Sequence, residues 1–512
     1  MRILDKLLLL LAAVLLLLIC WQPPDAGCDF WAHASVGRWI YEHRQVPHSS
    51  LFLWTYNGPW LAHSWLAELG SYLLMQIGGE MGGPVLAATL TVLVVLTAFA
   101  LSLWPIIRER GLPPLPALLV ICATFASVDR LLPRPELFTT LFMAIVCRMI
   151  LDYRSADEPR KAIRRIWLLP ALFALWTNLH GAVAFGLVIL WAAAVADYAQ
   201  FRDRQAGSLI KIVACSTAAI VINPYGIHYL AAYAPLTNHS FYYIPEWKPF
   251  WKAPVLETRV PISELIIAVC AAVAWALAPR RRWCGMAWLI VTVAAFLQAR
   301  RNMDLLALTG LFVFSAHYAE AMKSGVMAKI LKLRETRSLS VSYGTFTALV
   351  TCYSAYLLIM FCISMAHSPF VSTLQFSVPR QQASFIADKL GGNVRLLNLY
   401  NQAAYLEWRL GDHSASFYID GLNAYPLSVY DDYNDIWNAT PRGLRLLESG
   451  KINCIAGVPL VDHIGPRLYG YLEHNAEWKI VYAGWDGPVF VHDTSSRARS
   501  ASAAPARAKA VS

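Results

Sequence analysis

Long apolar stretches alternate with short polar spans through the first 366 positions of the chain. The stretches run to roughly 15 to 24 residues, close to the length that an α-helix needs to cross a bilayer. The spans between them often end in charges, Pro or Gly, which are typical of helix ends. The pattern predicts about eleven transmembrane helices: residues 7–21, 85–107, 113–129, 137–152, 166–178, 182–198, 208–222, three helices that end at Arg280, Arg300 and Lys323, and residues 344–366.

The pattern changes after the last of these helices. Apolar runs shorten and polar residues interleave from about Ser368 to Asp493, and the runs at 394–399, 415–420 and 452–457 predict strands separated by helical stretches. The expected domains are a transmembrane domain over 1–367 with long outer loops at 22–84 and 223–260, a soluble α/β domain over 368–493 and a disordered tail over 494–512.

Composition supports the bilayer as solvent. The chain is 57% hydrophobic and 15% charged, with a mean hydropathy of +0.44, a balance that a water-soluble surface does not accommodate. The net charge of +10 comes mostly from Lys and Arg in short loops between apolar stretches, where they set topology, so nucleic-acid binding is not expected. No small-residue cleavage site follows the first apolar stretch, which we expect to be retained as a membrane helix.

Basic clusters alternate with the apolar stretches in a way that predicts topology. With the N-terminus cytoplasmic, the main basic loops fall on the cytoplasmic side and the C-terminal domain falls outside. This topology also predicts that one set of polar residues lies at the outer face of the membrane. Because ionisable residues near a bilayer usually face a cavity, we expect them to line a chamber there. These residues are Asp29, His33, His63, Glu68, Arg134, Asn178, His180, Asn223, Glu246 and Arg300.

Two carboxylates in the first outer loop are candidate catalytic groups. Asp29 lies just after a predicted helix, where a partly desolvated carboxylate suits a general base; the alternative is that Asp29 caps a helix over Ala32 to Ile40. Glu68 is either a second catalytic carboxylate or an ordinary first-turn Glu. Asp25 follows two prolines and is interpreted as a turn residue.

Arginines in later outer loops are candidate phosphate ligands. Arg134 lies between two prolines that stiffen its backbone, which suits bidentate phosphate recognition; the alternative is an arginine that reaches to the membrane interface. Arg300 and Arg301 lie on the side of the membrane where positive charge is normally sparse, which favours a functional role in binding a lipid phosphate.

The remaining candidates are sugar or acceptor ligands. Asn178 and His180, in WTNLHG, either bind the sugar or satisfy the backbone of a turn between two helices. Glu246 beside Trp247 could hydrogen-bond and stack on a sugar, although Trp is also common at interfaces. His33 and His63 complete this set. The NPYG at Asn223 is interpreted first as a helix-stopping turn.

The order of these motifs resembles that of the GT-C superfamily of integral-membrane glycosyltransferases, in particular the bacterial group related to protein mannosyltransferases and aminoarabinose transferases. The matching segments extend from Asp29 to Gly421: DFWAH, HSWLAE, RPELF, WTNLHG, NPYG, IPEW, ARRN, YLEWRL and FYIDG. The chain departs from the paired acidic pattern of such enzymes, because position 27 is Gly. The choice between Asp25 and Asp29 as base, and the need for a divalent metal, therefore remain open.

The resemblance implies a GT-C-like polytopic enzyme of the bacterial inner membrane. It implies a polyprenyl-phosphate-linked sugar as donor, a glycan, lipid or protein as acceptor, Asp29 as base, and Arg134 with Arg300 or Arg301 as phosphate ligands, with inversion at the sugar carbon. No cofactor is otherwise expected, and the residues argue for no metal site. The rival interpretations are a transporter or flippase of a lipid-linked substrate and a non-catalytic membrane assembly protein; against the transporter, no internal repeat is seen.

Overall fold

The computed structural model describes residues 28–110, 114–127, 130–155, 158–233, 245–252, 262–324, 378–411, 415–422, 425–458 and 467–493, together with residues 14, 21, 24 and 25. The predicted helix at 344–366, the predicted tail and nearly all of the predicted helix at 7–21 lie outside these residues. The chain divides into two compact units. The helical unit consists of Met1–Gln22 and Ala88–Ser368, and the mixed unit consists of Pro23–Ala87 and Pro369–Ser512.

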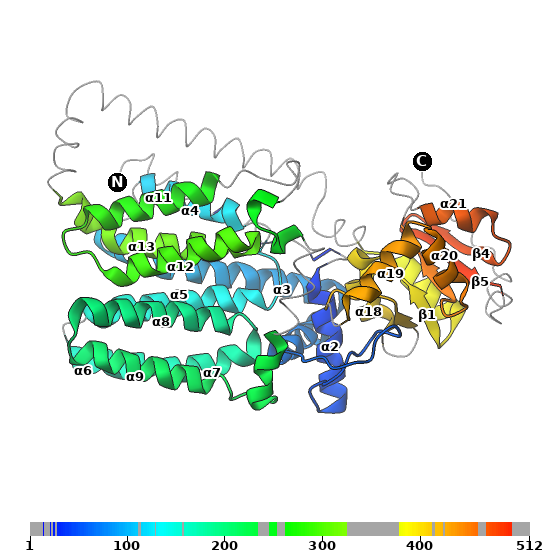
Figure 1. The fold of residues 1–512 in the computed structure, drawn as a ribbon, viewed down its shortest axis with the longest axis horizontal. Helices are drawn as coiled ribbons and strands as arrows, with labels where there is room; N and C mark the ends of the chain where they lie inside the picture. Colours follow the sequence, from blue (N-terminus) through cyan, green and yellow to red (C-terminus); the bar gives the residue numbers. More distant parts are fainter. Residues whose placement is uncertain are drawn as a thin grey trace, which may run out of the picture. The chain divides into compact units, whose positions relative to one another are not determined.

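The helical unit is a set of packed helices that follow the predicted apolar stretches closely (Figure 1). Its elements are the second half of α3 (Trp65–Arg110), α4 (Pro114–Ser127), α5 (Glu136–Ser155), α6 (Pro159–Ile166), α7 (Leu169–Leu179), α8 (Val183–Phe201), α9 (Arg204–Ala219), α11 (Ile262–Leu277), α12 (Trp283–Gln298) and α13 (Met303–Met322). Helix α13 packs against α4, α11 and α12, and α8 packs against α9 and α12. Buried apolar side chains such as Trp176, Trp288 and Phe312 fill the space between the helices.

Local sequence explains where these helices begin. Pro159 starts α6 and Pro170 lies in the first turn of α7, positions where the missing N–H of proline costs nothing. Asp203 caps α9 by accepting a hydrogen bond of 2.8 Å from the Ala206 N–H. Helix α6 lies in the basic segment that was predicted as a loop before residue 166, so this segment is partly helical. The next helix, α7, starts at Leu169.

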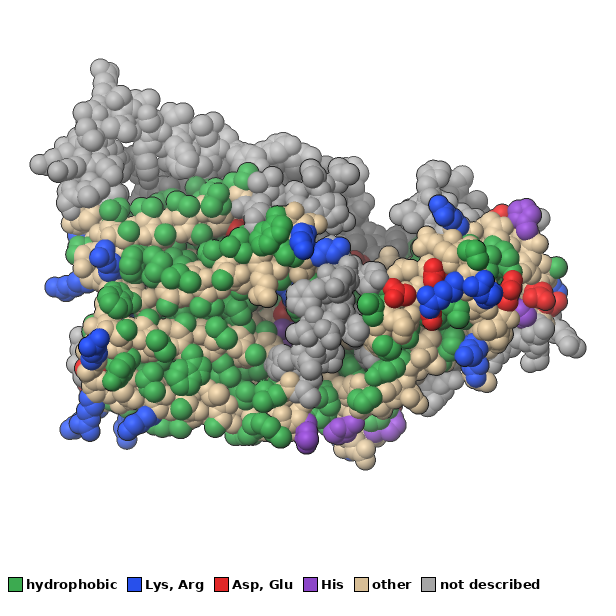
Figure 2. Space-filling view, viewed as in Figure 1, with side chains coloured by type: hydrophobic (Ala, Val, Ile, Leu, Met, Phe, Trp, Pro, Cys, Tyr) green, Lys and Arg blue, Asp and Glu red, His purple; other side chains and the backbone are tan. Residues whose placement is uncertain are grey.

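Length and composition identify helices of the helical unit as membrane spans. Among the described residues, three helical segments are long and apolar enough to cross a bilayer: Trp65–Arg108, Val183–Phe201 and Arg300–Met322. Helices α4, α11 and α12 are also apolar but shorter. Leu93, Leu265 and Ile290 are exposed on the sides of these helices, which is expected where the surroundings are lipid. Figure 2 shows this apolar lateral surface, with Lys and Arg gathered at the ends of the helices. The chain is a multi-pass membrane protein.

Helix α3 joins the two units and contains a break. Gly79 has a φ of 65° and a ψ of −169°, a conformation outside the helical region that only glycine adopts readily. The end of the predicted outer loop at 22–84 and the predicted helix at 85–107 thus form one run of helix with a kink in it.

The mixed unit contains a five-stranded sheet with the strand order β2-β1-β3-β5-β4. Its strands are β1 (Val394–Leu397), β2 (Ala415–Phe417), β3 (Cys454–Ala456), β4 (Trp478–Gly484) and β5 (Gly487–His492). Strand β1 runs parallel to β2 and β3, whereas β5 is antiparallel to β3 and β4. The three strands predicted from sequence are confirmed, and the structure adds the β4–β5 hairpin.

Short helices precede or separate the strands in the described residues from 378 to 493. They are α17 (Arg380–Phe385), which continues as a π-helical turn to Leu390, α18 (Ala403–Leu410), α19 (Leu427–Trp437), α20 (Pro441–Glu448) and α21 (Arg467–His474). The apolar faces of the strands form the core, since Val394, Leu396, Phe417, Ile455 and Val491 are all buried. A small α/β fold near the C-terminus is therefore present, as the alternation of short strands and helices predicted.

The first loop belongs to this α/β fold rather than to the helical unit. Backbone hydrogen bonds of 2.9 Å from Phe417 to Phe52 and of 3.1 Å from Trp54 to Phe417 add the loop to the edge of β2. Helix α2 (Asp29–His43) packs against α18, with the rings of Trp31 and Tyr405 5.1 Å apart in an edge-to-face arrangement. These contacts hold two segments that are far apart in sequence in one folded unit.

Candidate functional site

An arginine cluster lies at one end of the helical unit, where α4, α5 and α13 begin or end. We use this name for Arg130, Arg134, Glu136, Glu246 and Arg301. Arg130 is 5% exposed and binds two carboxylates, Glu136 at 2.9 Å and Glu246 at 2.7 Å. Arg301 lies 3.6 Å from Glu136 and 3.7 Å from Glu246, and Arg134 lies 3.9 Å from Glu136. The network fixes the guanidinium groups in place before any ligand arrives.

The short helices around the cluster set the position of Arg301. The guanidinium carbon of Arg301 lies 3.9 Å from the centre of the Trp247 ring, a cation–π contact. Helix η3 (Pro245–Trp247) contacts η5 (Arg300–Asn302), and the Arg300 N–H donates a hydrogen bond of 3.1 Å to the Lys248 carbonyl. Arg134 and Arg301 are 19% and 22% exposed, so both remain open to a ligand, unlike Arg130.

The loop between α7 and α8 lies beside this cluster. His180 shares a hydrogen bond of 2.8 Å with the Thr139 hydroxyl, one turn after Glu136 on α5. The Asn178 amide donates 2.7 Å hydrogen bonds to the carbonyls of Ala174 and Ile222, so this side chain ties α7 to the end of α9. These contacts are of the kind expected where Asn178 satisfies the backbone of the turn.

The NPYG segment is a turn, as predicted. The Asn223 side chain accepts a hydrogen bond of 2.8 Å from the Tyr225 N–H and donates one of 2.8 Å to the Ile220 carbonyl. Gly226 has a φ of 57°, which glycine adopts without strain. The predicted outer-face residues of the helical unit, from Arg134 to Arg300, thus come from loops at the same end of the bundle.

In the mixed unit, Asp29 is the first residue of α2. Cys28 occupies the cap position, so the alternative in which Asp29 caps this helix is wrong, although its charge suits the first turn. A Cβ placed on Gly421 would lie 3.8 Å from the Asp29 Oδ1, which brings the end of the FYIDG motif against Asp29. Asp25 is exposed, and its carbonyl accepts hydrogen bonds from Cys28 and Trp31, as expected of a turn residue.

Asp29 belongs to a carboxylate cluster, a name we use for Asp29, Glu407 and Asp420. Glu407 is fully buried on α18, and Asp420, which follows β2, is 1% exposed. Burial, together with the nearby charges of Asp420 and Asp29, raises the pKa of Glu407 well above its ordinary value. Three carboxylates of unequal exposure therefore share one small region of this unit.

Glu68 lies close to His33, across the packing of α2 against α3. The His33 Nδ1 and Glu68 Oε1 atoms are 3.4 Å apart, and Glu68 is 1% exposed. A Cβ on Gly37 would lie 2.0 Å from the Glu68 backbone oxygen, so only glycine permits this approach of α2 to α3. His63 is half-buried just before α3 begins.

Sequence reasoning did not single out Arg130, Glu136 or Glu407, which the structure places in these clusters. Arg130 lies in a predicted outer loop without a motif of its own, yet it joins Glu136 and Glu246. Glu407 lies inside the YLEWRL motif, where a single acidic residue on an otherwise buried apolar helix face was the available signal. No group of three or more His, Cys, Asp and Glu residues within the described part of the chain is arranged to hold a metal ion.

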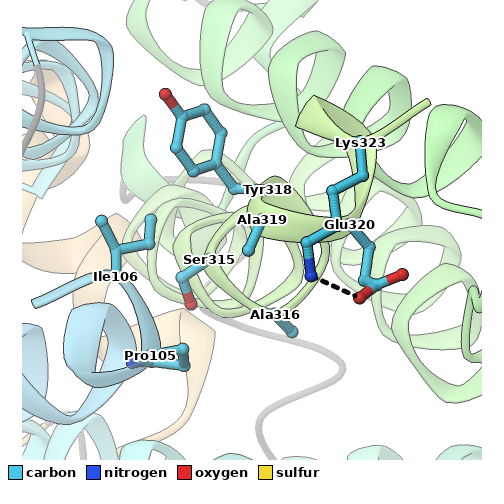
Figure 3. A pocket seen from close by; sticks show the side chains of 8 residues that line it. All are labelled: Pro105, Ile106, Ser315, Ala316, Tyr318, Ala319, Glu320 and Lys323. Atoms are coloured by element: carbon cyan, nitrogen blue, oxygen red, sulfur yellow. Dashed lines mark hydrogen bonds and ion pairs between the residues drawn. The ribbon is translucent and has the colours of Figure 1, made fainter. Parts of the chain in front are cut away.

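A small pocket lies at the other end of α13 (Figure 3). It has a volume of about 120 Å³ and lies between the end of α3, at Pro105 and Ile106, and the last turns of α13. An ion pair of 3.3 Å between Lys323 and Glu320 borders it. None of the predicted site residues lines this pocket.

Known structures with the same arrangement of elements identify the fold. ArnT from Cupriavidus metallidurans, bound to undecaprenyl phosphate, matches over 96% of this chain and 98% of its own, with a TM-score of 0.52 and 14% identity. The apo oligosaccharyltransferase of Archaeoglobus fulgidus matches over 88% of this chain and 69% of its own, with a TM-score of 0.52 and 11% identity. The chain has the GT-C glycosyltransferase fold.

A third GT-C structure, the arabinofuranosyltransferase AftD from Mycobacteria, matches over 96% of this chain at 15% identity and a TM-score of 0.50. The chain spans 40% of the length of AftD, whereas it covers ArnT almost from end to end. By sequence, no known family and no curated protein matches the chain. In this GT-C fold, the arginine cluster belongs to the helical unit and the carboxylate cluster belongs to the mixed unit.

Proposed function

We propose that the protein is an inverting glycosyltransferase of the bacterial inner membrane that moves a sugar from a polyprenyl-phosphate donor to an acceptor hydroxyl on the outer face. The observation that carries the proposal is the arginine cluster, in which Arg134 and Arg301 are preorganised and still open to an anion, within a GT-C fold. ArnT, which has the same fold, is bound to undecaprenyl phosphate, a lipid phosphate. A fold alone hosts many functions, so the charged residues must carry the assignment.

In the proposed reaction, Asp29 accepts the proton of the acceptor hydroxyl. The acceptor oxygen forms a bond to the anomeric carbon while the bond from that carbon to the phosphate oxygen breaks. The lipid phosphate leaves with the bonding electrons, and its added negative charge is stabilised by Arg134, Arg300 and Arg301. Because this charge grows in the transition state, arginines fixed in advance accelerate the reaction.

The other candidate residues take supporting roles in the proposal. Trp247 beside Glu246 offers an aromatic face and a carboxylate of the kind that bind a sugar. His180, close to the arginine cluster, is a second sugar ligand. Glu68, His33 and His63 lie near the start of α3 and serve the acceptor side. The N-terminus is cytoplasmic and the mixed unit extracytoplasmic.

The test is the profile of lipid-linked sugars and surface glycans, by mass spectrometry, in a strain that lacks the protein. The strain is complemented with the wild type, with Asp29→Asn, or with Asp25→Asn as a control at the exposed turn residue. We expect Asp29→Asn to lower transfer by about 10²- to 10⁴-fold, as loss of a general base does. The lipid donor should then accumulate in the deletion strain and with Asp29→Asn, but not with Asp25→Asn.

Full restoration of the glycan by Asp29→Asn would refute the proposed chemistry. A chain that restored glycan synthesis without Asp29 would act as a transporter or an assembly protein instead. Expression of each variant in the membrane is checked by immunoblot, so that a loss of protein is not mistaken for a loss of catalysis.

A further inference from the structure

Glu407 is a buried carboxylate that the proposed reaction does not use. It lies on α18, is fully buried, and neither of its carboxylate oxygens has a hydrogen-bond partner among the described residues. An ionised carboxylate in such a place would lose its hydration without compensation, which carries a free-energy cost. Protonation removes that cost.

The groups around Glu407 favour the same protonation state. The charged groups that act on it are Asp420, which follows β2, and Asp29, at the start of α2. Both are acidic, so neither can compensate a negative charge on Glu407. Because like charges in one site cannot all ionise readily, the most buried member retains its proton.

Asp29 differs from Glu407 in exposure, which assigns the two carboxylates different roles. Asp29 is partly exposed at the first turn of α2, whereas Glu407 is sealed beneath it by the packing of α2 against α18. The edge-to-face contact of Trp31 with Tyr405 forms part of that seal. An acceptor hydroxyl can approach Asp29 but not Glu407.

We propose that Glu407 stays protonated in the folded protein, so that Asp29 is the group of the carboxylate cluster that accepts the substrate proton. The role of Asp29 in this inference rests on the proposed function, whereas the protonation of Glu407 does not. Glutamine has the shape of a protonated glutamate and carries no charge. Glu407→Gln therefore reproduces the neutral form at every pH.

The first experiment measures thermal unfolding of the full-length protein in lipid nanodiscs from about pH 5 to about pH 8, which needs no activity. An acid whose pKa is raised on folding destabilises the folded state as the pH rises from the ordinary glutamate range, about 4.3, towards the raised value. We expect the Tm of the wild type to fall over this range and that of Glu407→Gln to fall less. Glu473→Gln, at an exposed position on α21, should follow the wild type.

The second experiment measures transfer activity against pH for the wild type, Glu407→Gln and Glu407→Met. We expect Glu407→Gln to keep activity within about threefold of the wild type, and both Glu407→Gln and Glu407→Met to extend activity to higher pH, because neither side chain can ionise. Equal pH dependence of the Tm in the wild type and Glu407→Gln would overturn the inference.

Two activity results would also overturn the inference. Loss of activity in Glu407→Gln as severe as in Asp29→Asn would mean that Glu407 works in its charged form, as a base or as part of a cation site. A loss of activity at high pH that is as steep in both variants as in the wild type would mean that the proton on Glu407 is not needed for transfer. If the wild type transferred no sugar, the proposed function would be refuted. The Tm measurement would still decide whether Glu407 is protonated.

Discussion

The His33 Nδ1 atom lies 3.4 Å from the Glu68 Oε1 atom, where α2 packs against α3. Glu68 is 1% exposed, whereas Asp29 is partly exposed, so the two carboxylates of the first loop differ in their access to a substrate. This difference favours a positioning role for Glu68, with His33 as its partner, and a direct role for Asp29.

We therefore expect Glu68→Gln to reduce kcat much less than Asp29→Asn does. Glutamine keeps the shape of Glu68 and a hydrogen-bonding atom near His33, so the loss should stay within about tenfold, against the 10²- to 10⁴-fold typical of a lost general base. The measurement is initial rates with a lipid-linked donor and purified protein. Equal losses in the two variants would show that both carboxylates take part in proton transfer.

Gly37 should be required for the packing of α2 on α3. A Cβ at this position would lie 2.0 Å from the Glu68 backbone oxygen, so Gly37→Ala should lower the free energy of unfolding by about 1–3 kcal/mol, as overpacking does. Gly70→Ala is the matched control, because no heavy atom lies within 4 Å of a Cβ there. Thermal unfolding in detergent measures both; a Gly37→Ala protein as stable as Gly70→Ala would contradict the observed helix packing.

Arg130 should act mainly through stability. It is nearly buried and pairs with Glu136 and Glu246, so Arg130→Leu leaves two carboxylates without this partner and should cost about 3–5 kcal/mol. Adding Glu136→Gln should recover part of that loss, since one uncompensated charge is removed. Lys161→Leu, at an exposed ion pair with Glu158, should cost no more than about 1 kcal/mol. A similar Tm for Arg130→Leu and Lys161→Leu would contradict the role of Arg130.

Arg301 should act through donor binding. Lysine keeps the charge but loses the planar fork and its stacking on Trp247, so Arg301→Lys should weaken the apparent affinity for a polyprenyl-phosphate sugar by about tenfold, or about 1.4 kcal/mol. Arg442→Lys, at a mostly exposed ion pair of α20, is the control and should bind normally. The measurement is KM for the donor. An unchanged KM in Arg301→Lys would remove Arg301 from the phosphate site.

Hydrophobic periodicity was sufficient to predict most of the helical unit, because a membrane helix must satisfy its backbone internally and present apolar side chains to lipid. Helices α4, α5, α8, α12 and α13 begin or end within a few residues of the predicted bounds. The strands at Val394, Ala415 and Cys454 were likewise visible as short apolar runs. The helix that precedes the kink at Gly79 was not predicted as part of a membrane span, because the glycines from Gly78 to Gly83 indicate a loop as readily as a break within a helix.

The sequence by itself determined the membrane-protein class, the α/β fold near the C-terminus, and the individual candidates Asp29, Arg134 and Arg301. Only the tertiary structure decided which of them lie together. It joined Arg130 to Glu246, 116 positions away, and Asp29 to Gly421 and Glu407. The pattern of apolar and polar residues shows whether a segment faces lipid, water or a core. The protonation and orientation of a buried charge depend instead on its neighbours, which only long-range packing brings together.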